Sequence, residues 1–200
     1  MLENDLELLL DAVNAAGKIA LRYFRKNPKV WEKGSNEGPV TEADIEINNM
    51  LVDRLLSARQ DYGWLSEETE DDPGRLDKDY VFIVDPIDGT RSFIDGHENY
   101  ACALGIAFKG VMKVAAVKMP SLEQTFWASV GSGAYQNGKR INVSSRSEVH
   151  GSSILTAKPN LDSIYWPGGV PPMRQFYRSS LAYRLCLAAN GSFDAMVTLR

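Results

Sequence analysis

Residues 81–93 read VFIVDPIDGTRSF, in which four apolar residues are followed at once by two aspartates in a short turn. The unbroken run of Val, Phe and Ile predicts a strand that is covered on both faces of its sheet. Pro86 cannot donate a hydrogen bond to a central ladder, so strand pairing should stop there. Asp85 and Asp88 would then stand at the exit of the strand. The stretch therefore predicts a buried strand that ends in an acidic site.

The turn after this strand suits an anion beside a metal ion. Gly89 permits close approach of the backbone, and free N–H groups at Gly89 and Thr90 would bind an anion. Paired carboxylates on a short rigid spacer are what a hard cation such as Mg²⁺ needs, and without a cation the two charges would repel. The structural alternative is that Asp85 and Asp88 only cap a turn, because Asp-Gly is a common turn dipeptide.

Length and composition place the chain among ordinary soluble globular domains. Its 200 residues are 44% apolar and 24% charged, which is enough to bury a sizeable core in one domain. The net charge of −4 argues against nucleic acid and anionic membrane surfaces as partners. The first residues are acidic and lack the plan of a signal peptide, and no run approaches the roughly 18 apolar residues of a membrane span. We therefore expect a cytoplasmic protein.

Hydrophobic spacing divides the rest of the chain into helices and strands. Apolar residues at spacings of three and four predict helices over residues 2–26 and 179–189. Residues 28–40 are rich in Gly, Pro, Ser and Asn and predict an exposed, possibly mobile loop. Further strands are predicted over residues 101–108, 111–119, 124–129 and 193–199. No internal repeat or linker divides the chain, so we expect one domain.

Acidic residues outside the central stretch have structural as well as functional interpretations. A helix opens at residues 41–44, a Thr-x-x-Asp arrangement that resembles a capping box, so Asp44 could serve only the helix N-terminus. Glu67 and Glu68 follow apolar Trp64 and Leu65 and are candidates for a site. The acidic run just after them is typical of solvated surface.

Residues 133–140 read GAYQNGKR and nearly match the phosphate-loop pattern Gly-x₄-Gly-Lys-[Ser/Thr]. The position of the Mg²⁺-binding hydroxyl is occupied by Arg140, and the residues that follow are typical of a strand rather than of a helix. We therefore reject a phosphate loop and predict that Asn137 and Gly138 form a type I′ hairpin turn.

Three blocks of the chain together resemble the inositol monophosphatase family, the Mg²⁺-dependent, lithium-sensitive phosphomonoesterases. Residues 85–93 resemble the family's metal-binding signature, and residues 66–69, SEET, resemble its paired-glutamate segment. Residues 40–44, VTEAD, resemble the segment whose Asp works with the threonine of the signature. Lys33 lies in what would be the mobile metal-sensing loop. Residues 178–180 and 191–195 are similar to a later helix and strand, so the resemblance covers nearly the whole chain.

The resemblance implies a layered αβαβα sandwich, an α+β architecture, as one domain over residues 1–200 and as a homodimer. It also implies two or three Mg²⁺ ions. Glu67, Asp85 and the Ile87 carbonyl would hold one ion, while Asp85 and Asp88 would hold a second, so that Asp85 bridges the two. Ions roughly 3.5–4 Å apart can clamp the attacking and leaving oxygens of an in-line displacement.

The resemblance further implies catalytic and substrate-binding roles near the metal ligands. Thr90, hydrogen-bonded to Asp44, would take the proton of the attacking water, which Glu67 helps to activate. The amides of Gly89 and Thr90, next to Asp88, would hold phosphate oxygens as charge moves to the leaving alkoxide. No covalent phospho-enzyme is needed.

The sequence departs from the family pattern near its C-terminus. Members continue into a segment whose aspartate completes the second metal site, whereas this chain stops at Arg200. We expect a piece of a longer protein rather than a degenerate member, because an apolar strand rarely ends a chain without a partner. In inositol-preferring members, the position that corresponds to Arg200 holds an acidic residue that contacts the sugar hydroxyls. Tyr183 likewise replaces a small residue on the preceding helix.

These departures leave the substrate open. Inositol 1-phosphate, hydrolysed to inositol and phosphate, is the nominal substrate. An arginine fork recognises a second phosphate well, which favours 3′(2′),5′-bisphosphate nucleotides or sugar bisphosphates as the alternative. A hypothesis of a different class is a non-catalytic module that binds phosphate or a partner and keeps the fold with an incomplete site.

Overall fold

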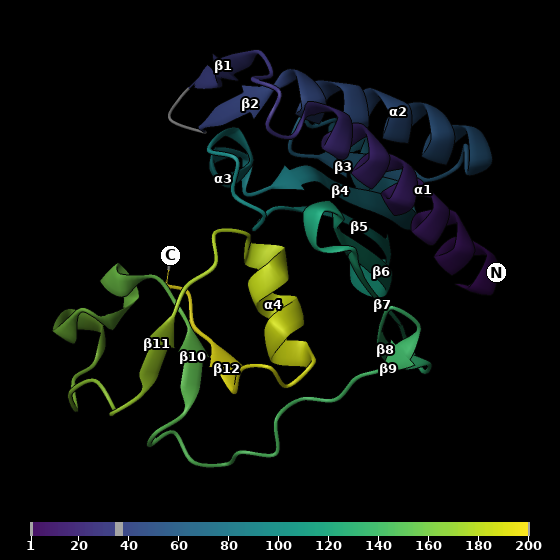
Figure 1. The fold of residues 1–200 in the computed structure, drawn as a ribbon. Helices are drawn as coiled ribbons and strands as arrows, with labels where there is room; N and C mark the ends of the chain where they lie inside the picture. Colours follow the sequence, from purple (N-terminus) through teal and green to yellow (C-terminus); the bar gives the residue numbers. More distant parts are fainter. Residues whose placement is uncertain (1, 35–37, 200) are drawn as a thin grey trace.

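A seven-stranded sheet forms the centre of the computed structural model, which describes residues 2–34 and 38–199 (Figure 1). Its strands run in the order β3-β4-β5-β6-β7-β8-β9. Only β3 and β4 are parallel, and the other neighbours are antiparallel. The strands are β3 (Gly63–Ser66), β4 (Tyr80–Asp88), β5 (Ala101–Phe108), β6 (Val111–Met119), β7 (Gln124–Ser129), β8 (Gly133–Gln136) and β9 (Lys139–Arg140).

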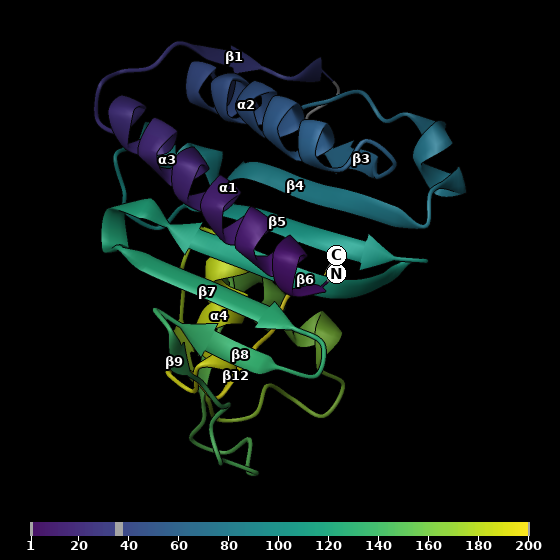
Figure 2. The same cartoon turned by 90° about the vertical axis from the view of Figure 1, so that its right-hand side faces the viewer.

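Two helices cover one face of this sheet, as Figure 2 shows from the side of α1. Helix α1 (Leu2–Tyr23) and helix α2 (Glu42–Ala58) bury their apolar stripes against the alternate residues of β4 and β5 that point toward them. Phe82 and Ile106 are fully buried in this cluster. The predicted helix at the N-terminus is confirmed, and so are the three antiparallel strands after the central stretch.

The other face of the sheet meets helix α4 (Leu181–Ala189) and a small three-stranded sheet (Figure 1). Ser180 caps α4, because its hydroxyl accepts from the amide of Tyr183. The small sheet has the order β11 (Arg174–Phe176), β10 (Ser153–Leu155) and β12 (Ala195–Met196), with parallel pairing throughout. Helices, sheet, helix and sheet thus form the first four layers of the expected αβαβα sandwich.

Several local predictions need correction. The segment before α2 is an antiparallel hairpin of β1 (Val30–Glu32) and β2 (Pro39–Thr41), not an irregular loop, although β1 is exposed as expected. The last predicted strand is reduced to two residues in β12. Ile83 is 37% exposed, so β4 is not covered on both faces by the described residues.

The hairpin between β8 and β9 is confirmed, because Asn137 and Gly138 both have positive φ, at 47° and 76°. The remaining elements are short helices, and none of the described helices is long and apolar enough to cross a membrane. They are α3 (Thr90–Ile94), η2 (Pro73–Asp77), η3 (Pro120–Leu122), η4 (Lys158–Leu161) and η5 (Ser163–Tyr165).

Asp194 ties the small sheet to the segment that leads into it. Its carboxylate accepts from the Ser144 hydroxyl at 2.6 Å and from the amide and hydroxyl of Ser153 at 2.7 and 2.8 Å. These hydrogen bonds lower the pKa of Asp194 to about 2, with a smaller contribution from Arg146. The ionised form is therefore favoured in the folded protein.

We expect Asp194→Asn to lower the melting temperature at neutral pH. Because the folded-state pKa lies below the unfolded value, this stabilisation is fully present above about pH 4 and is lost as the pH falls toward 2. Thermal unfolding of both proteins at several pH values should show the difference shrinking on acidification. Glu148→Gln, which removes a charge from an exposed residue of the same segment, is the control and should show no such trend.

Candidate functional site

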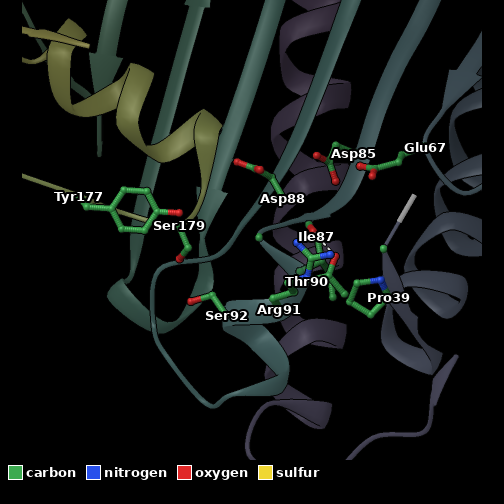
Figure 3. A pocket seen from close by; sticks show the side chains of 12 residues that line it. Pro39, Glu67, Asp85, Ile87, Asp88, Thr90, Arg91, Ser92, Tyr177 and Ser179 are labelled. Carbon is green, nitrogen blue, oxygen red and sulfur yellow. Dashed lines mark hydrogen bonds between the residues drawn. The ribbon is translucent and has the colours of Figure 1, made fainter. Parts of the chain in front are cut away.

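The parallel pairing of β3 and β4 brings two carboxylates to the same edge of the sheet. Ser66 is in register with Val84, and the amide of Glu67 donates to the Val84 carbonyl at 3.3 Å. Glu67 therefore follows the end of β3 just where Asp85 emerges from β4. Figure 3 shows the two side chains pointing toward one another.

A bulge in β4 aims the residues after Asp85. Asp85 pairs with Ala103 and Asp88 pairs with Ala101, so β4 has one more residue than β5 between the two pairs. Pairing is interrupted after Asp85, as Pro86 predicts, but it resumes at Asp88 instead of ending. Such a bulge bends the strand and increases its twist, which redirects side chains at the edge of a site.

The turn after the bulge is built on glycine. Gly89 has φ +95°, and a Cβ there would lie 3.1 Å from the Asn99 carbonyl oxygen and 3.5 Å from the Ser180 backbone, so the position needs glycine on two grounds. Thr90 begins α3 and donates its hydroxyl hydrogen bond to the Ile87 carbonyl at 3.0 Å. The backbone between the two aspartates is thereby held in a fixed shape.

These elements surround an open cavity of about 250 Å³. The strand ends and the α3 turn form one wall, β2 and the residue before it form a second, and the segment that leads into α4 forms a third (Figure 3). The lining residues are Gly38, Pro39, Glu67, Asp85, Ile87, Asp88, Gly89, Thr90, Arg91, Ser92, Tyr177 and Ser179.

Among the residues that line this cavity, Asp85 has the most strongly shifted pKa. Burial raises its pKa to about 9, and the neighbouring charges of Glu67, Asp88 and Asp44 add to the shift. Without a cation, the neutral form of Asp85 is therefore favoured, because a further negative charge here is unfavourable. A hard divalent cation would reverse this effect, and the carboxylate and carbonyl oxygens present are the donors that Mg²⁺ prefers. The donor set fits such an ion.

Asp88 is shared between the cavity and helix α4. Its Oδ2 accepts from the Ser180 hydroxyl at 2.5 Å and from the Ala182 amide at 2.6 Å. Within residues 2–34 and 38–199, no three acidic, imidazole or thiol side chains are grouped closely enough to hold a metal ion by themselves. Glu67 and Asp85 thus form the facing pair, while Asp88 fixes the start of α4 against the end of β4.

Asp44 caps helix α2. Its Oδ2 accepts from the amide and hydroxyl of Thr41 at 2.8 and 2.6 Å, which confirms the predicted capping box. The expected hydrogen bond from Thr90 to Asp44 is absent from the described part of the chain, since the Thr90 hydroxyl donates to the Ile87 carbonyl.

A second feature of Asp44 goes beyond capping. Its Oδ1 is buried without a hydrogen-bond partner among the described residues. Burial raises the pKa of Asp44 to about 6 against the opposing hydrogen bonds from Thr41, with a further contribution from Glu68. Unsatisfied buried oxygens are uncommon and costly. Capping alone does not account for this one.

Lys33 connects the β1–β2 hairpin to the paired glutamates. Its ammonium lies 2.6 Å from Glu68 Oε1 and 3.6 Å from Glu67 Oε1, and it donates to the Glu67 carbonyl at 3.3 Å. Burial lowers the pKa of Lys33, but the hydrogen bond that Lys33 donates to Glu68 and the charges of both glutamates outweigh burial and raise it. The positive charge of Lys33 therefore lies beside the carboxylates of Glu67 and Glu68.

Comparison with known proteins identifies the wider group to which this arrangement belongs. The model described as "Inositol monophosphatase family" matches residues 1–200. The chain belongs to the inositol monophosphatase family. A relative titled "Histidinol-phosphatase" from Chlorobaculum parvum is 34% identical over 152 residues, which cover 76% of this chain and 58% of the relative. "Inositol-1-monophosphatase" of Rhizobium meliloti is 33% identical over 158 residues, or 78% of this chain and 59% of the relative.

Solved structures of the family share the fold. The Thermotoga maritima IMPase has a TM-score of 0.86 at 27% identity, and the match covers 100% of this chain and 77% of that one. The suhB protein of Bartonella henselae has a TM-score of 0.83 at 28% identity, with coverage of 98% and 80%. The chain spans less than two thirds of the first curated relatives that it matches.

Two substrate-contact predictions made from the family pattern have different outcomes. Tyr183 is 7% exposed and packs in an apolar cluster with Met119, Phe126 and Leu155, so it faces the sheet and does not line the cavity. Its position does not support direct contact with substrate. Arg200 lies outside the described residues.

Sequence reasoning missed several residues that line the cavity. Arg91 and Ser92 stand inside the family signature without an assigned role. Tyr177 lies just before the predicted helix over residues 179–189, and Ser179 is the first residue of that prediction, but neither was placed at the site. Only the fold reveals that this distant segment completes the wall. Asn48 was also missed, although it lies one helical turn after Asp44 on α2, and that spacing places both on one helix face.

Proposed function

We propose that the complete protein hydrolyses small phosphate monoesters with Mg²⁺ at this cavity. The observation that carries the proposal is the meeting of the Glu67 and Asp85 carboxylates beside the turn of Gly89 and Thr90. Membership of the inositol monophosphatase family supports it. The enzyme would be a phosphoric monoester hydrolase that uses water as its nucleophile.

Each residue of the site has a proposed part. Glu67, Asp85, the Ile87 carbonyl and Asp88 would hold two or three ions, with Asp85 shared between two of them. When bound, Mg²⁺ would supply the positive charge that activates water and stabilises the leaving oxygen. The bulge and the turn at Gly89 keep these oxygens at fixed positions, which is the contribution of the chain itself.

The phosphate and the proton would be handled by the start of α3. The amides of Gly89 and Thr90 would donate to phosphate oxygens as charge builds up on them. Thr90 would take the proton of the attacking water and pass its own to Asp44, for which its hydroxyl must leave the Ile87 carbonyl. The unpartnered Oδ1 of Asp44 supports a role for this carboxylate beyond capping.

Substitution of Asp44 separates capping from proton transfer. If Asp44 acts through Thr90, Asp44→Asn and Thr90→Ala should each lower kcat strongly, and the double variant should fall little further. A residue that only caps α2 would cost about 1 kcal/mol of stability and leave turnover unchanged. Steady-state kinetics of the three variants, together with their melting temperatures, distinguish the two cases. Additive losses in kcat would count against a shared relay.

Inositol 1-phosphate is the first substrate to test, because relatives in bacteria and plants are titled inositol monophosphatases. Other relatives are titled "Histidinol-phosphatase" and "Fructose-1,6-bisphosphatase/inositol-1-monophosphatase", so the ester group is not fixed by the family. Bisphosphates stay in the proposal as the alternative. The guanidinium of Arg91 lines the cavity, forms no ion pair with another described residue, and would favour a second anionic group.

A panel of phosphate esters tests this order of substrate preference. Phosphate release by the complete protein should be measured with Mg²⁺, with and without Li⁺, on inositol 1-phosphate, histidinol phosphate, fructose 1,6-bisphosphate and adenosine 3′,5′-bisphosphate. We expect Mg²⁺-dependent, lithium-sensitive turnover with inositol 1-phosphate preferred. A specificity constant roughly tenfold higher for adenosine 3′,5′-bisphosphate, about 1.4 kcal/mol of transition-state preference, would overturn this order.

A non-catalytic function is the second candidate. Relatives titled "Nus factor SuhB" are 31% identical in Vibrio cholerae and 32% identical in Pseudomonas aeruginosa, so the family also contains proteins named for something other than hydrolysis. This candidate predicts that the complete protein binds phosphate or a partner without turning over any ester of the panel. We further propose that the protein is a cytoplasmic homodimer, which gel filtration with light scattering and cell fractionation would test.

A further inference from the structure

We propose that Asn48 is a positioning residue that fixes the glutamate pair of the metal site from helix α2. The inference rests on the proposed function, since it concerns how Glu67 is held for a cation. Asn48 is 5% exposed and lies on the buried face of α2, four residues after Asp44. It does not line the cavity. Its effect must therefore pass through the residues that it contacts.

Asn48 bonds to the residues on both sides of Glu67 and Glu68. The Ser66 hydroxyl donates to Asn48 Oδ1 at 2.7 Å, and Asn48 Nδ2 donates to the Thr69 hydroxyl at 3.0 Å. The Thr69 hydroxyl also lies 3.3 Å from Asn48 Oδ1. A single amide thus bridges the two hydroxyl residues that flank the acidic pair. An amide suits this position because it carries both an acceptor and donors.

The rest of the turn depends on this bridge. Ser66 Oγ accepts from the amide of Glu68 at 3.3 Å, so the hydroxyl that Asn48 orients also satisfies the turn backbone. Beyond it, the Glu67 amide bonds to Val84, and Lys33 bonds to the Glu67 carbonyl. The acidic pair follows a strand of only four residues at the edge of the sheet, where few ladder bonds restrain it. Tethering to a helix is a physical solution to that weakness.

Loss of the hydrogen bonds made by Asn48 should lower the affinity of the site for its cation. Without Asn48, the hydroxyls of Ser66 and Thr69 can rotate, and Glu67 samples positions away from Asp85. Partners of ligand residues typically change metal affinity or activity by 10–100-fold when they are removed. The phosphate-binding turn at Gly89 belongs to a different element, and among the described residues the Asn48 side chain bonds to Ser66 and Thr69 rather than to this turn. The KM for substrate should therefore change little at saturating Mg²⁺.

The experiment compares four forms of the complete protein: wild type, Asn48→Ala, Thr69→Val and Asn49→Ala. Thr69→Val keeps the side-chain shape but removes the hydroxyl from the bridge. Asn49 is the matched control, since it is the adjacent asparagine on α2 and is exposed. The half-saturating Mg²⁺ concentration is measured twice, from turnover and from the rise in melting temperature with added Mg²⁺. The second measurement needs no activity.

We expect the half-saturating Mg²⁺ concentration to rise at least about tenfold for Asn48→Ala, less for Thr69→Val, and not at all for Asn49→Ala. A lower melting temperature with an unchanged half-saturating concentration would show a merely structural role and overturn the inference, while the proposed function would stand. If Asn48→Ala does not fold, Thr69→Val decides by the same criterion. A wild type that binds Mg²⁺ but hydrolyses nothing would refute the function alone, and a wild type that gains no stability from Mg²⁺ would refute both.

Discussion

Asp85→Asn is expected to lower phosphatase turnover at least about 100-fold, the scale seen when a fixed electrostatic group is lost from an active site. Asp85 faces Glu67 and would be the ligand shared by two ions, and an amide cannot supply the same charge. Turnover should be followed over a Mg²⁺ titration. Glu68→Gln is the comparison, because Glu68 pairs with Lys33 and is not proposed as a ligand. Glu68→Gln should lose less turnover than Asp85→Asn. Near-normal turnover by Asp85→Asn would refute the assignment of Asp85 as the ligand shared by two ions.

The same variant should keep the fold. With its pKa raised to about 9, the neutral form of Asp85 is favoured in the metal-free protein, and asparagine closely resembles a neutral carboxyl group. Since the folded-state pKa lies above the unfolded value, metal-free wild type should lose stability as the pH rises from about 4 toward 9. Asp85→Asn should lose less over that range. Thermal unfolding in EDTA at several pH values would measure this.

Gly89→Ala should lower both stability and turnover. A left-handed residue other than glycine costs on the order of 1–3 kcal/mol, and a Cβ at φ +95° would also lie 3.1 Å from the Asn99 carbonyl oxygen. The turn must shift to relieve this contact, and misplacement by about 1 Å can cost roughly 100-fold in rate. Chemical denaturation and steady-state kinetics give the two quantities.

Gly131→Ala is the matched control for this change. Gly131 has φ +85°, but a Cβ there meets nothing within 4 Å, and the residue does not line the cavity. The control should lose stability through backbone strain alone and keep its turnover. Equal turnover losses in the two variants would show that strain, and not the position of the turn, governs the effect.

The parts of this fold that sequence reasoning predicted are those with a local cause. The capping box at Thr41 and Asp44 and the positive-φ pair at Asn137 and Gly138 form because neighbouring residues supply the hydrogen bonds and torsions. Strand β4 was also predicted from a local feature, its unbroken run of apolar residues. Its exposure at Ile83 was not, because burial depends on what lies across the sheet.

The parts that were missed depend on contacts between distant segments. The β1–β2 hairpin has strands of three residues, too short to show a period. The bonds of Asp88 to Ser180 and Ala182 were not predicted, because they join residues more than 90 positions apart. Asn48 was overlooked, since its partners follow it by 18 and 21 positions and no motif connects them.

Anomalous diffraction from Mn²⁺-soaked crystals of the complete protein tests the central claim most directly. Mn²⁺ prefers the same oxygen ligands as Mg²⁺ and can be located by its anomalous signal. The account predicts a peak between the carboxylates of Glu67 and Asp85, within about 2.5 Å of an oxygen of each, and its disappearance in Asp85→Asn crystals. Soaked crystals with no peak at this edge of the sheet, or with a peak only at surface carboxylates elsewhere, would contradict it.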